Sequence, residues 1–362
     1  MISILLGIIP LYTFSLASGG PAVMFWSWIL VGLMTLVLVS SLAEICSAYP
    51  TMGALYYWAF RLGGPEWGGF GSWMAGWTNL LGQIAGVASG GFAGAQIFAE
   101  IVFMTHNVRL DRFAVLGLYA LMLIVAGVVN TFAERLLTAV CYISCVWQTL
   151  GTLLIVVWML VKAPTLQNAS FVFCSTHNET GFSSFGYVCL VGTLAAASVF
   201  TGYDTAAHVA EETHDSHEST PRSMLLACVN ALVLGVILIV GMNFSVQGNL
   251  SNVLSSDDDG MQVKQAYTLI WEQSVGPQVT VLFLCITLVA IECSNCANLT
   301  SAARMVFSFA RDRALPFSKV WHHIDKARGG PTRATWLSLF VAFLLGVPSL
   351  GNSAGTHVCF RC

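Results

Sequence analysis

The chain has 362 residues and a formal net charge of −3, and only 9% of its residues are charged while 56% are hydrophobic. About a quarter of the residues of a typical soluble domain are charged, so this composition excludes that class of protein. The small negative charge also gives no reason to expect a nucleic acid or another polyanion as a partner.

Long apolar runs fill most of the chain and predict a polytopic membrane protein. A helix needs roughly 20 apolar residues to cross the hydrocarbon core of a bilayer. The candidate spans are residues 2–17, 21–46, 70–103, 113–132, 136–161, 186–208, 224–246, 277–304 and 333–350. The first is short for a span. The third is long enough to be tilted or to run on past the membrane.

Basic residues fall mainly on one side of the membrane if the chain starts in the cytoplasm and alternates. The cytoplasmic side then holds ten of the 15 Lys and Arg residues, namely Arg61, Arg135, Arg222, Arg304, Arg311, Arg313, Lys319, Lys326, Arg328 and Arg333. The other side holds Arg109, Arg112, Lys162, Lys264 and Arg361. This asymmetry follows the positive-inside rule and predicts an integral multi-pass protein of the plasma membrane or an organelle membrane.

Two spans contain residues that disfavour a continuous membrane helix. In the first, Gly7 weakens the helix and Pro10 lacks a backbone donor, so we expect a break there. In the sixth, Gly202 and Asp204 predict a second break, and a charged residue at this depth marks a functional site by default. Broken helices at matching places in two halves indicate a transporter site. The alternatives are a simple kink and, for Asp204, capping of the following half-helix rather than pairing with a substrate amine.

The third span carries Gly82, Gly86, Gly90 and Gly94 on one face, and this spacing is typical of close helix packing. Gln83 lies beside this glycine face. An amide in lipid needs a partner, so Gln83 either lines a cavity or bonds to a neighbouring helix.

Acidic residues occur near the inner end of the second span and within the eighth. We expect Glu44 to lie near the cytoplasmic interface and to pair with a basic residue. Glu292 and Asn295 are one turn apart and share a helix face. Contact with substrate, transfer of a proton and bonding to a neighbouring helix all stay open for this pair.

A cluster of charged and imidazole side chains follows the sixth span: His208, Glu211, Glu212, His214, Asp215 and His217. Its spacing fits no metal site, and we expect a solvated inner loop. The sequence holds no phosphate-binding loop, nucleophile elbow or zinc-protease motif. We therefore expect no enzyme activity, no cofactor and no metal. Asn168 and Asn178 begin glycosylation sequons in a loop that we place outside, and they are candidates for glycosylation in a eukaryotic secretory route.

Several longer stretches resemble one transporter family. Ala-Glu-Ile-Cys-Ser-Ala-Tyr-Pro-Thr at 43–51 and Gly-Ala-Leu-Tyr-Tyr-Trp at 53–58 resemble the end of the second span in amino acid–polyamine–organocation transporters. Gly-Trp-Thr-Asn-Leu-Leu-Gly-Gln-Ile-Ala at 76–85 is similar to the amino acid/choline branch, which includes choline and GABA permeases and bidirectional amino-acid transporters. Phe-Thr-Gly-Tyr-Asp at 200–204, and Ser-Ala-Ala-Arg at 301–304 with Phe-Ala-Arg-Asp at 309–312, resemble its sixth and eighth spans.

The resemblance implies an all-α polytopic membrane fold built from an inverted five-helix repeat (LeuT-like), of which about nine spans are present. It implies residues 1–162 as the first repeat, 163–185 as an exterior loop and 186–362 as an incomplete second repeat. It places substrate at the midplane between broken spans one and six, walled by spans three and eight. The substrate-binding candidates are Gly7, Ile8, Gln83, Thr201, Gly202, Tyr203, Asp204 and Asn295, and the coupling or gating candidates are Glu44, Glu212 and Glu292.

The expected function is secondary active transport of amino acids or related small amines, of the GABA, choline and polyamine class, by alternating access. The expected partners are that substrate, the lipid bilayer and a coupling proton or cation. Leu6 departs from the family, which commonly has Thr there, and spans after the ninth are lacking. We therefore expect a chain truncated at both ends that does not transport as it stands. The alternative functions are a membrane sensor that binds the same ligand and a non-transporting truncated form.

Overall fold

Helices make up nearly all of the structure, a computed structural model that describes residues 3–132, 134–248, 250–254, 264–325 and 330–350. The helices are α1 (Ile4–Ala17), α2 (Gly20–Ala48), α3 (Ala54–Leu62), α4 (Gly64–His106), α5 (Arg112–Phe132), α6 (Glu134–Lys162), α7 (Ala169–Cys174), α8 (Phe185–Val199), the 3-10 helix η1 (Tyr203–Glu212), α9 (Ser216–Phe244), α10 (Leu250–Leu254), α11 (Ala266–Val275), α12 (Pro277–Arg311), α13 (Ser318–Trp321), α14 (Thr332–Gly346) and the 3-10 helix η2 (Val347–Leu350). The basic residues Lys326, Arg328 and Arg361 of the topology prediction lie outside the described residues.

The predicted spans correspond to helices of the structure. Within the described residues, eight helical segments are long and apolar enough to cross a membrane, and α1 is apolar but has only 14 residues. The protein is therefore an all-α, multi-pass integral membrane protein. The helix α4 has 43 residues and is about 65 Å long at 1.5 Å per residue, so it runs on past the bilayer core as the sequence predicted.

The expected break in the first span is wrong. The helix α1 is continuous from Ile4 to Ala17 with Pro10 inside it. Its start is capped by Ser3, whose side chain accepts a hydrogen bond from the backbone of Leu6 at 3.3 Å. Pro10 removes one hydrogen bond in the middle of the helix, and burial of Ile8 and Tyr12 on either side stabilises this turn.

The expected break in the sixth span is confirmed. The helix α8 ends at Val199, and the chain continues from Tyr203 as the 3-10 helix η1. Gly202 lies between them with φ +87°, a left-handed conformation that side chains disfavour. The two half-helices together occupy one apolar span.

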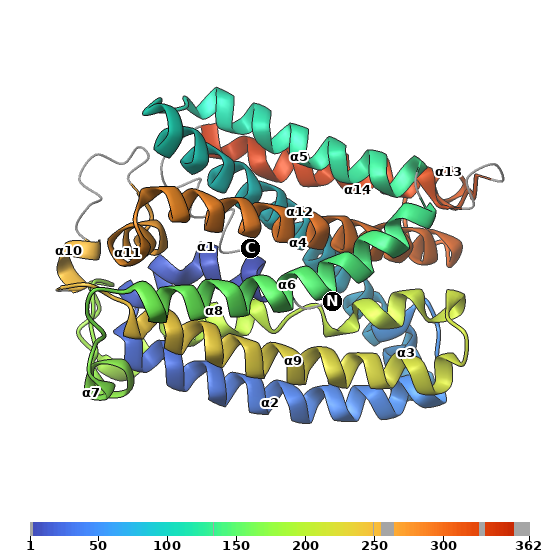
Figure 1. The fold of residues 1–362 in the computed structure, drawn as a ribbon. Helices are drawn as coiled ribbons and strands as arrows, with labels where there is room; N and C mark the ends of the chain where they lie inside the picture. Colours follow the sequence, from blue (N-terminus) through green and yellow to red (C-terminus); the bar gives the residue numbers. More distant parts are fainter. Residues whose placement is uncertain (1–2, 133, 249, 255–263, 326–329, 351–362) are drawn as a thin grey trace.

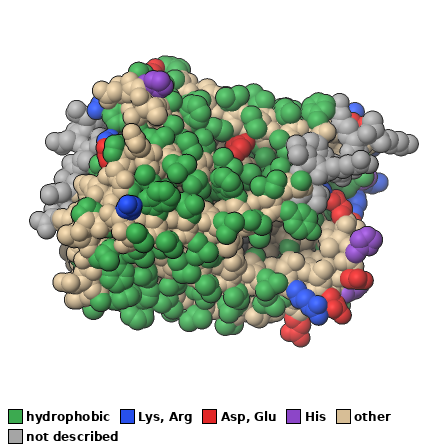
Figure 2. Space-filling model, viewed as in Figure 1, with side chains coloured by type: hydrophobic (Ala, Val, Ile, Leu, Met, Phe, Trp, Pro, Cys, Tyr) green, Lys and Arg blue, Asp and Glu red, His purple; other side chains and the backbone are tan. Residues whose placement is uncertain are grey.

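Two groups of packed helices form the bundle. Helix α2 lies along α9, and α8 and α1 join this pair, while α4 lies along α12 together with α5 and α14 (Figure 1). Close approach in the first group depends on a glycine, because a Cβ at Gly235 would overlap the Trp28 ring. Hydrophobic side chains cover most of the middle of the visible face, and charged side chains lie mainly at its two ends, with the larger group at the right (Figure 2).

The two ends of the bundle carry the loops that the sequence placed on opposite sides of the membrane. Helices α3 and α13 lie at one end, and α7, α10 and α11 lie at the other (Figure 1). Arg61 and Lys319 belong to the α3 and α13 end, and Lys264 precedes α11 at the opposite end. The assignment of the α3 and α13 end to the cytoplasm stays a prediction.

Cysteine labelling in intact cells checks this orientation. After exposed native thiols such as that of Cys174 are replaced, a cysteine at Ser175 should react with a membrane-impermeant maleimide, because the α7 end faces outside. A cysteine at Lys319 should react only after the cells are permeabilised. Labelling of position 319 but not 175 in intact cells would reverse the orientation.

Candidate functional site

The break between α8 and η1 is polar but locally satisfied. The Phe200 amide donates to Ala196 O, and the Thr201 hydroxyl donates to Ser198 O at 2.6 Å. The hydroxyl hydrogen of Thr201 is thus used within the break. Gly202 begins η1 with no side chain capping its first amides. The free amide end of η1 carries a partial positive charge, and the carbonyl end of α8 beside it carries a partial negative charge.

Asp204 faces helix α4, and whether it serves as a helix cap or as a substrate contact stays a prediction. Its Oδ2 accepts a hydrogen bond from Gln83 Nε2 at 3.1 Å and lies 3.5 Å from Nε2 of His208. Asp204 is inside the first turn of η1, and its buried side chain reaches across to α4. Tyr203 is half-buried and packs among apolar side chains.

His208 extends this contact by one turn. Its Nε2 lies 3.3 Å from Asn79 Nδ2 of α4, and its Nδ1 lies 3.1 Å from Met52 O. The expectation of a solvated loop is therefore wrong for His208, which is fully buried. The segment is a 3-10 helix packed against α9, α12 and α3, so its inner face is closed to water.

The pairing of η1 with α4 places an open, unfilled position of α4 level with the break in the sixth span. Asn79 meets His208 and Gln83 meets Asp204, so the next turn of α4, at Gly86, lies level with the break at Gly202. A Cβ at Gly86 would have no atom within 4 Å. Gly86 is near the midpoint of α4, at the depth where a substrate was expected.

The expected packing of the glycine face holds only for its outer half. A Cβ at Gly90 would lie 2.9 Å from Asn295 Oδ1, and one at Gly94 would lie 3.5 Å from Ile291. Gly82 and Gly86 instead face open space. The four glycines are equivalent in the sequence, but α12 covers only two of them.

Asn295 and Glu292 are polar side chains without hydrogen bonds. Neither amide atom of Asn295 has a partner among the described residues, although the residue is fully buried. Both carboxylate oxygens of Glu292 are likewise shielded and unbonded. An unmade hydrogen bond of a buried group costs about 1–3 kcal/mol, so each of these groups calls for a functional explanation.

The first-span candidates lie next to the break. A Cβ at Gly7 would overlap the Val199 side chain, so the two spans are in direct contact there. Gly7 and Ile8 line a cavity of about 10 Å³ between α1, α2 and α8, which is room for about one water molecule. The structure therefore brings Gly7 and Ile8 to the end of α8 and brings Gln83 to Asp204. Asn295 of α12 lies against Gly90, one turn along α4 from Gly86.

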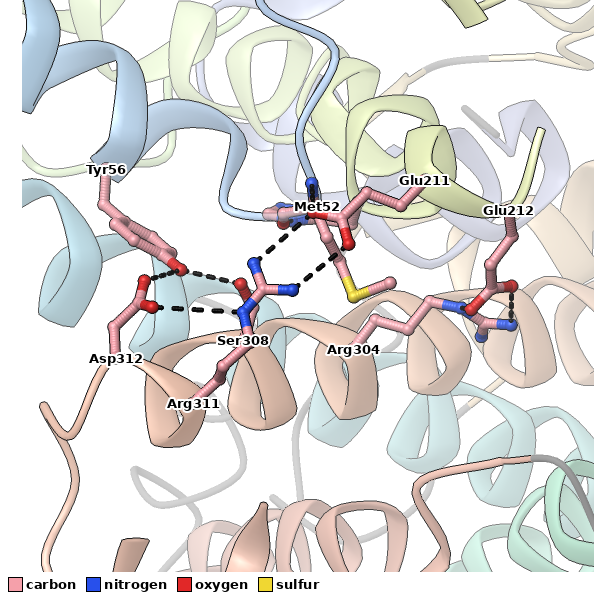
Figure 3. Close-up of polar contacts among 9 residues, drawn as sticks. Met52, Tyr56, Glu211, Glu212, Arg304, Ser308, Arg311 and Asp312 are labelled. Atoms are coloured by element: carbon pink, nitrogen blue, oxygen red, sulfur yellow. Dashed lines mark hydrogen bonds and ion pairs between the residues drawn. The ribbon is translucent and has the colours of Figure 1, made fainter. Parts of the chain in front are cut away.

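Two ion pairs tie η1 to α12 at the α3 and α13 end (Figure 3). Arg304 binds Glu212 with two nitrogens, Nε at 2.9 Å and Nη2 at 2.6 Å. Arg311 binds Glu211 at 3.1 Å, and Glu211 also accepts from the Met52 amide at 2.9 Å. We call these four charged residues the inner clamp. They close the bundle below the open space.

A neutral tyrosine extends the inner clamp to α3. The Tyr56 hydroxyl donates to Asp312 Oδ2 at 2.7 Å and lies 2.6 Å from Ser308 Oγ (Figure 3). Burial raises the pKa of the Tyr56 hydroxyl, so it keeps its proton and remains a donor. The helix α3 is thereby fixed to the end of α12.

Glu44 does not have the basic partner expected for it. Its side chain is exposed on α2, and it takes part in none of the ion pairs between described residues. The clamp cations Arg304 and Arg311 are bound to the carboxylates of η1. Within the described ranges, no group of three His, Cys, Asp or Glu side chains is placed to hold a metal ion.

Both glycosylation candidates lie on the surface at the α7 end. Asn168 is exposed and precedes α7. Asn178 is exposed, and its amide donates to Phe182 O at 2.8 Å while its Oδ1 accepts from Thr180. Their glycosylation stays a prediction.

Sequence reasoning did not single out His208, Asn79, Tyr56, Arg304 or Arg311 as site residues. A local signal existed for His208, since small residues such as Ala207 and Ala210 recur among the charged ones and indicate a packed face. The partners of Arg304 and Arg311 lie 92 and 100 positions away, and no local pattern shows such a pairing.

Comparisons with known proteins give one consistent result. The family model described as amino acid permease matches residues 1–358. The chain is 32% identical to the amino-acid permease BAT1 of Arabidopsis thaliana over 97% of this chain and 70% of that protein. It is also 32% identical to the BAT1 homolog of Oryza sativa, over 97% of this chain and 69% of the relative. An amino-acid permease of Schizosaccharomyces pombe is 27% identical over 98% of this chain and 65% of its own length.

Charge reversal tests whether Arg304 and Glu212 hold the bundle together. Arg304→Glu should lower the unfolding temperature in detergent, with a loss of about 1–2 kcal/mol in the free energy of unfolding. The reason is that the new carboxylate would face the carboxylate of Glu212 at a half-buried position. The double variant Arg304→Glu with Glu212→Arg should recover much of that loss.

The matched control is Arg222→Glu, which breaks an exposed pair with Glu218. It should change the unfolding temperature little. An equal effect of the two reversals would show that the inner clamp contributes no more than a surface ion pair.

Proposed function

We propose, for a chain that belongs to the amino acid permease family, that it transports amino acids across a membrane by alternating access and binds them in the open space beside Gly86. Membership of this family makes the protein a transporter and not an enzyme. The observation that carries the proposed site is the uncapped break at Gly202, level with an unfilled position on α4.

The break suits the two charges of an amino acid. The uncapped amide end of η1 attracts a carboxylate, and the carbonyl end of α8 attracts an ammonium group. The negative charge of Asp204 adds a second attraction for the ammonium group, since its carboxylate lies two residues from Gly202 and is held there by Gln83 and His208. Asn295, with a free donor and a free acceptor, is placed to bond to either group of the ligand.

The inner clamp fits the part of a cytoplasmic gate. It joins η1, which begins at the site, to the end of α12, which forms one wall of the site. Opening toward the α3 and α13 end requires that Glu212–Arg304 and Glu211–Arg311 separate. Exposed and half-exposed pairs of this kind contribute little individually, so substrate binding can supply the energy to open them.

The same proposal divides the chain into two repeats. Residues 1–162 form the first five-helix repeat, 163–185 an exterior loop, and 186–362 belong to an inverted second repeat. The contact of Gly7 with Val199 supports this reading, because α1 and α8 are the first helices of the two proposed repeats.

A panel of labelled substrates tests the function. Proteoliposomes of the full-length protein should take up one or more of the amino acids, and GABA, choline and polyamines complete the panel because the sequence resembles that branch. Saturable binding without uptake of any compound would favour the sensor that the sequence also allowed.

Filling the open space tests the location of the site. Gly86→Leu should abolish uptake while the protein still folds and reaches the membrane, because the new side chain starts at a position where no atom lies within 4 Å of its Cβ. The matched control is Gly117→Leu in α5, where the added side chain also meets no atom within 4 Å but faces outward. Normal uptake by Gly86→Leu would place the substrate elsewhere.

The charge of Asp204 gives a further prediction. Asp204→Asn keeps an acceptor for Gln83, so it should fold, but apparent affinity for substrate should fall because a charge-assisted hydrogen bond is about twice as strong as a neutral one. Asp204→Ala should also lose stability, by about 1–3 kcal/mol, because the Gln83 amide loses its acceptor.

Concentration-dependent uptake and unfolding temperatures separate the two effects, and Asp111→Asn in the exposed turn before α5 is the control. Unchanged affinity in Asp204→Asn would limit Asp204 to a structural contact with α4.

A further inference from the structure

One carboxylate of the bundle is used neither by the site nor by the inner clamp. Glu292 lies in the middle of α12, and both of its oxygens are shielded without a hydrogen bond. No Lys, Arg or His of the described ranges forms an ion pair with it. A lone charge at this depth is costly, and the neutral acid is the form that such surroundings favour.

The face of α12 that carries Glu292 differs from the face that borders the substrate site. Ile291 and Asn295 face α4, against Gly94 and Gly90. Glu292 follows Ile291 and is turned from it by about 100° around the helix axis. The carboxylate is therefore displaced from the α4 side, although Asn295 is only one turn away.

The surroundings of Glu292 are apolar groups and thiols. Cys296 is one turn further on the same face, and its carbonyl accepts a hydrogen bond from Asn130 of α5 at 3.1 Å. Cys293 and Cys296 of α12 are titratable groups that feel the charge of Glu292, and Cys141 of α6, which is also within electrostatic reach of Arg304, lies close to both thiols. The described parts of α4, α5 and α14 bring no charged side chain within ion-pair distance.

These surroundings make a proton, and not a metal ion, the cation that Glu292 can bind. Hard cations need about six oxygen ligands, and the described neighbours of Glu292 offer thiols instead. We propose that Glu292 is the proton-binding site of coupled transport, separate from the amino-acid site and linked to it through α12. This inference rests on the proposed transport function.

The chemistry is the movement of one proton in two steps, onto the carboxylate and off it again. Water on one side of the membrane gives a proton to the Glu292 carboxylate, and the acid gives it to water on the other side. The carboxylate has no partner in the closed bundle, so the proton can leave only when the packing around α12 opens to water. Proton release is thereby tied to a conformational change that also moves Asn295 at the amino-acid site.

Two transport modes separate this proposal from the proposed function. Proteoliposomes of the full-length protein are loaded with a mixture of the twenty amino acids, and exchange with the same labelled mixture is measured. Uptake into empty vesicles is then driven by an external acid pulse, and an entrapped pH-sensitive dye records proton entry. Glu292→Gln should exchange like the wild type, since Gln mimics the neutral acid, but should lose acid-driven accumulation and the dye signal.

The controls cover folding and charge. Glu292→Asp should retain some acid-driven uptake, because it keeps a proton site, and Glu66→Gln removes an exposed carboxylate at the start of α4 and should change neither mode. The wild type should show an infrared band of a neutral carboxylic acid, and this band should be missing in Glu292→Gln. A purely structural, ionised Glu292 would give no such band in the wild type.

Acid-driven accumulation that persists in Glu292→Gln would overturn the proposal. So would loss of exchange in Glu292→Gln with normal folding, because Glu292 would then serve the substrate site. A wild type that exchanges amino acids but ignores the acid pulse would overturn the proton site and leave the transport function intact. A wild type that exchanges none of them would instead contradict the proposed function.

Discussion

A backbone group that leaves its helix inside a bilayer must find another partner within the protein, and this constraint decides where the bundle can carry a site. The chain leaves helical geometry in mid-membrane between α8 and η1, where Thr201 satisfies Ser198 O and Gly202 supplies the left-handed turn. The first amides of η1 are left without a side-chain cap. The surrounding elements are arranged around this break, with α1 in contact at Val199 and α4 bound to Asp204.

The spans could be predicted from sequence because the lipid imposes their composition and length on each helix separately. The breaks were harder to predict, since Gly202 and Pro10 give similar local signals. Gly202 has a backbone conformation that ends a helix, whereas Pro10 only removes one donor from a helix that burial of Ile8 and Tyr12 stabilises. Local chemistry therefore identifies a possible break, and tertiary packing decides whether it forms.

The candidate residues could be named from the sequence, but their pairings could not. Gln83 and Asp204 were both candidates, yet their contact joins positions 121 residues apart and makes Asp204 a partner of α4. The inner clamp shows the same limit, because the charges of η1 resemble a solvated loop until Arg304 and Arg311 of α12 are placed beside them. Likewise, only the position of α12 distinguishes the covered Gly90 from the open Gly86.

Two carboxylates of the same bundle are given opposite surroundings, and this difference is what a coupled transporter needs. Asp204 has an amide and an imidazole within reach, so its charge can persist beside the substrate. Glu292 has neither, so the neutral acid is favoured and the charge becomes tolerable only when water enters. In enzyme active sites, too, two carboxyl groups in different surroundings take different protonation states, so that one acts as an acid and the other as a base. Here α12 connects them, since it carries Asn295 of the proposed amino-acid site and, one turn away, Glu292 of the proposed proton site. A movement of this helix that opens the site to one side of the membrane would also change the access of water to Glu292, and the two binding events would then depend on the same conformational equilibrium.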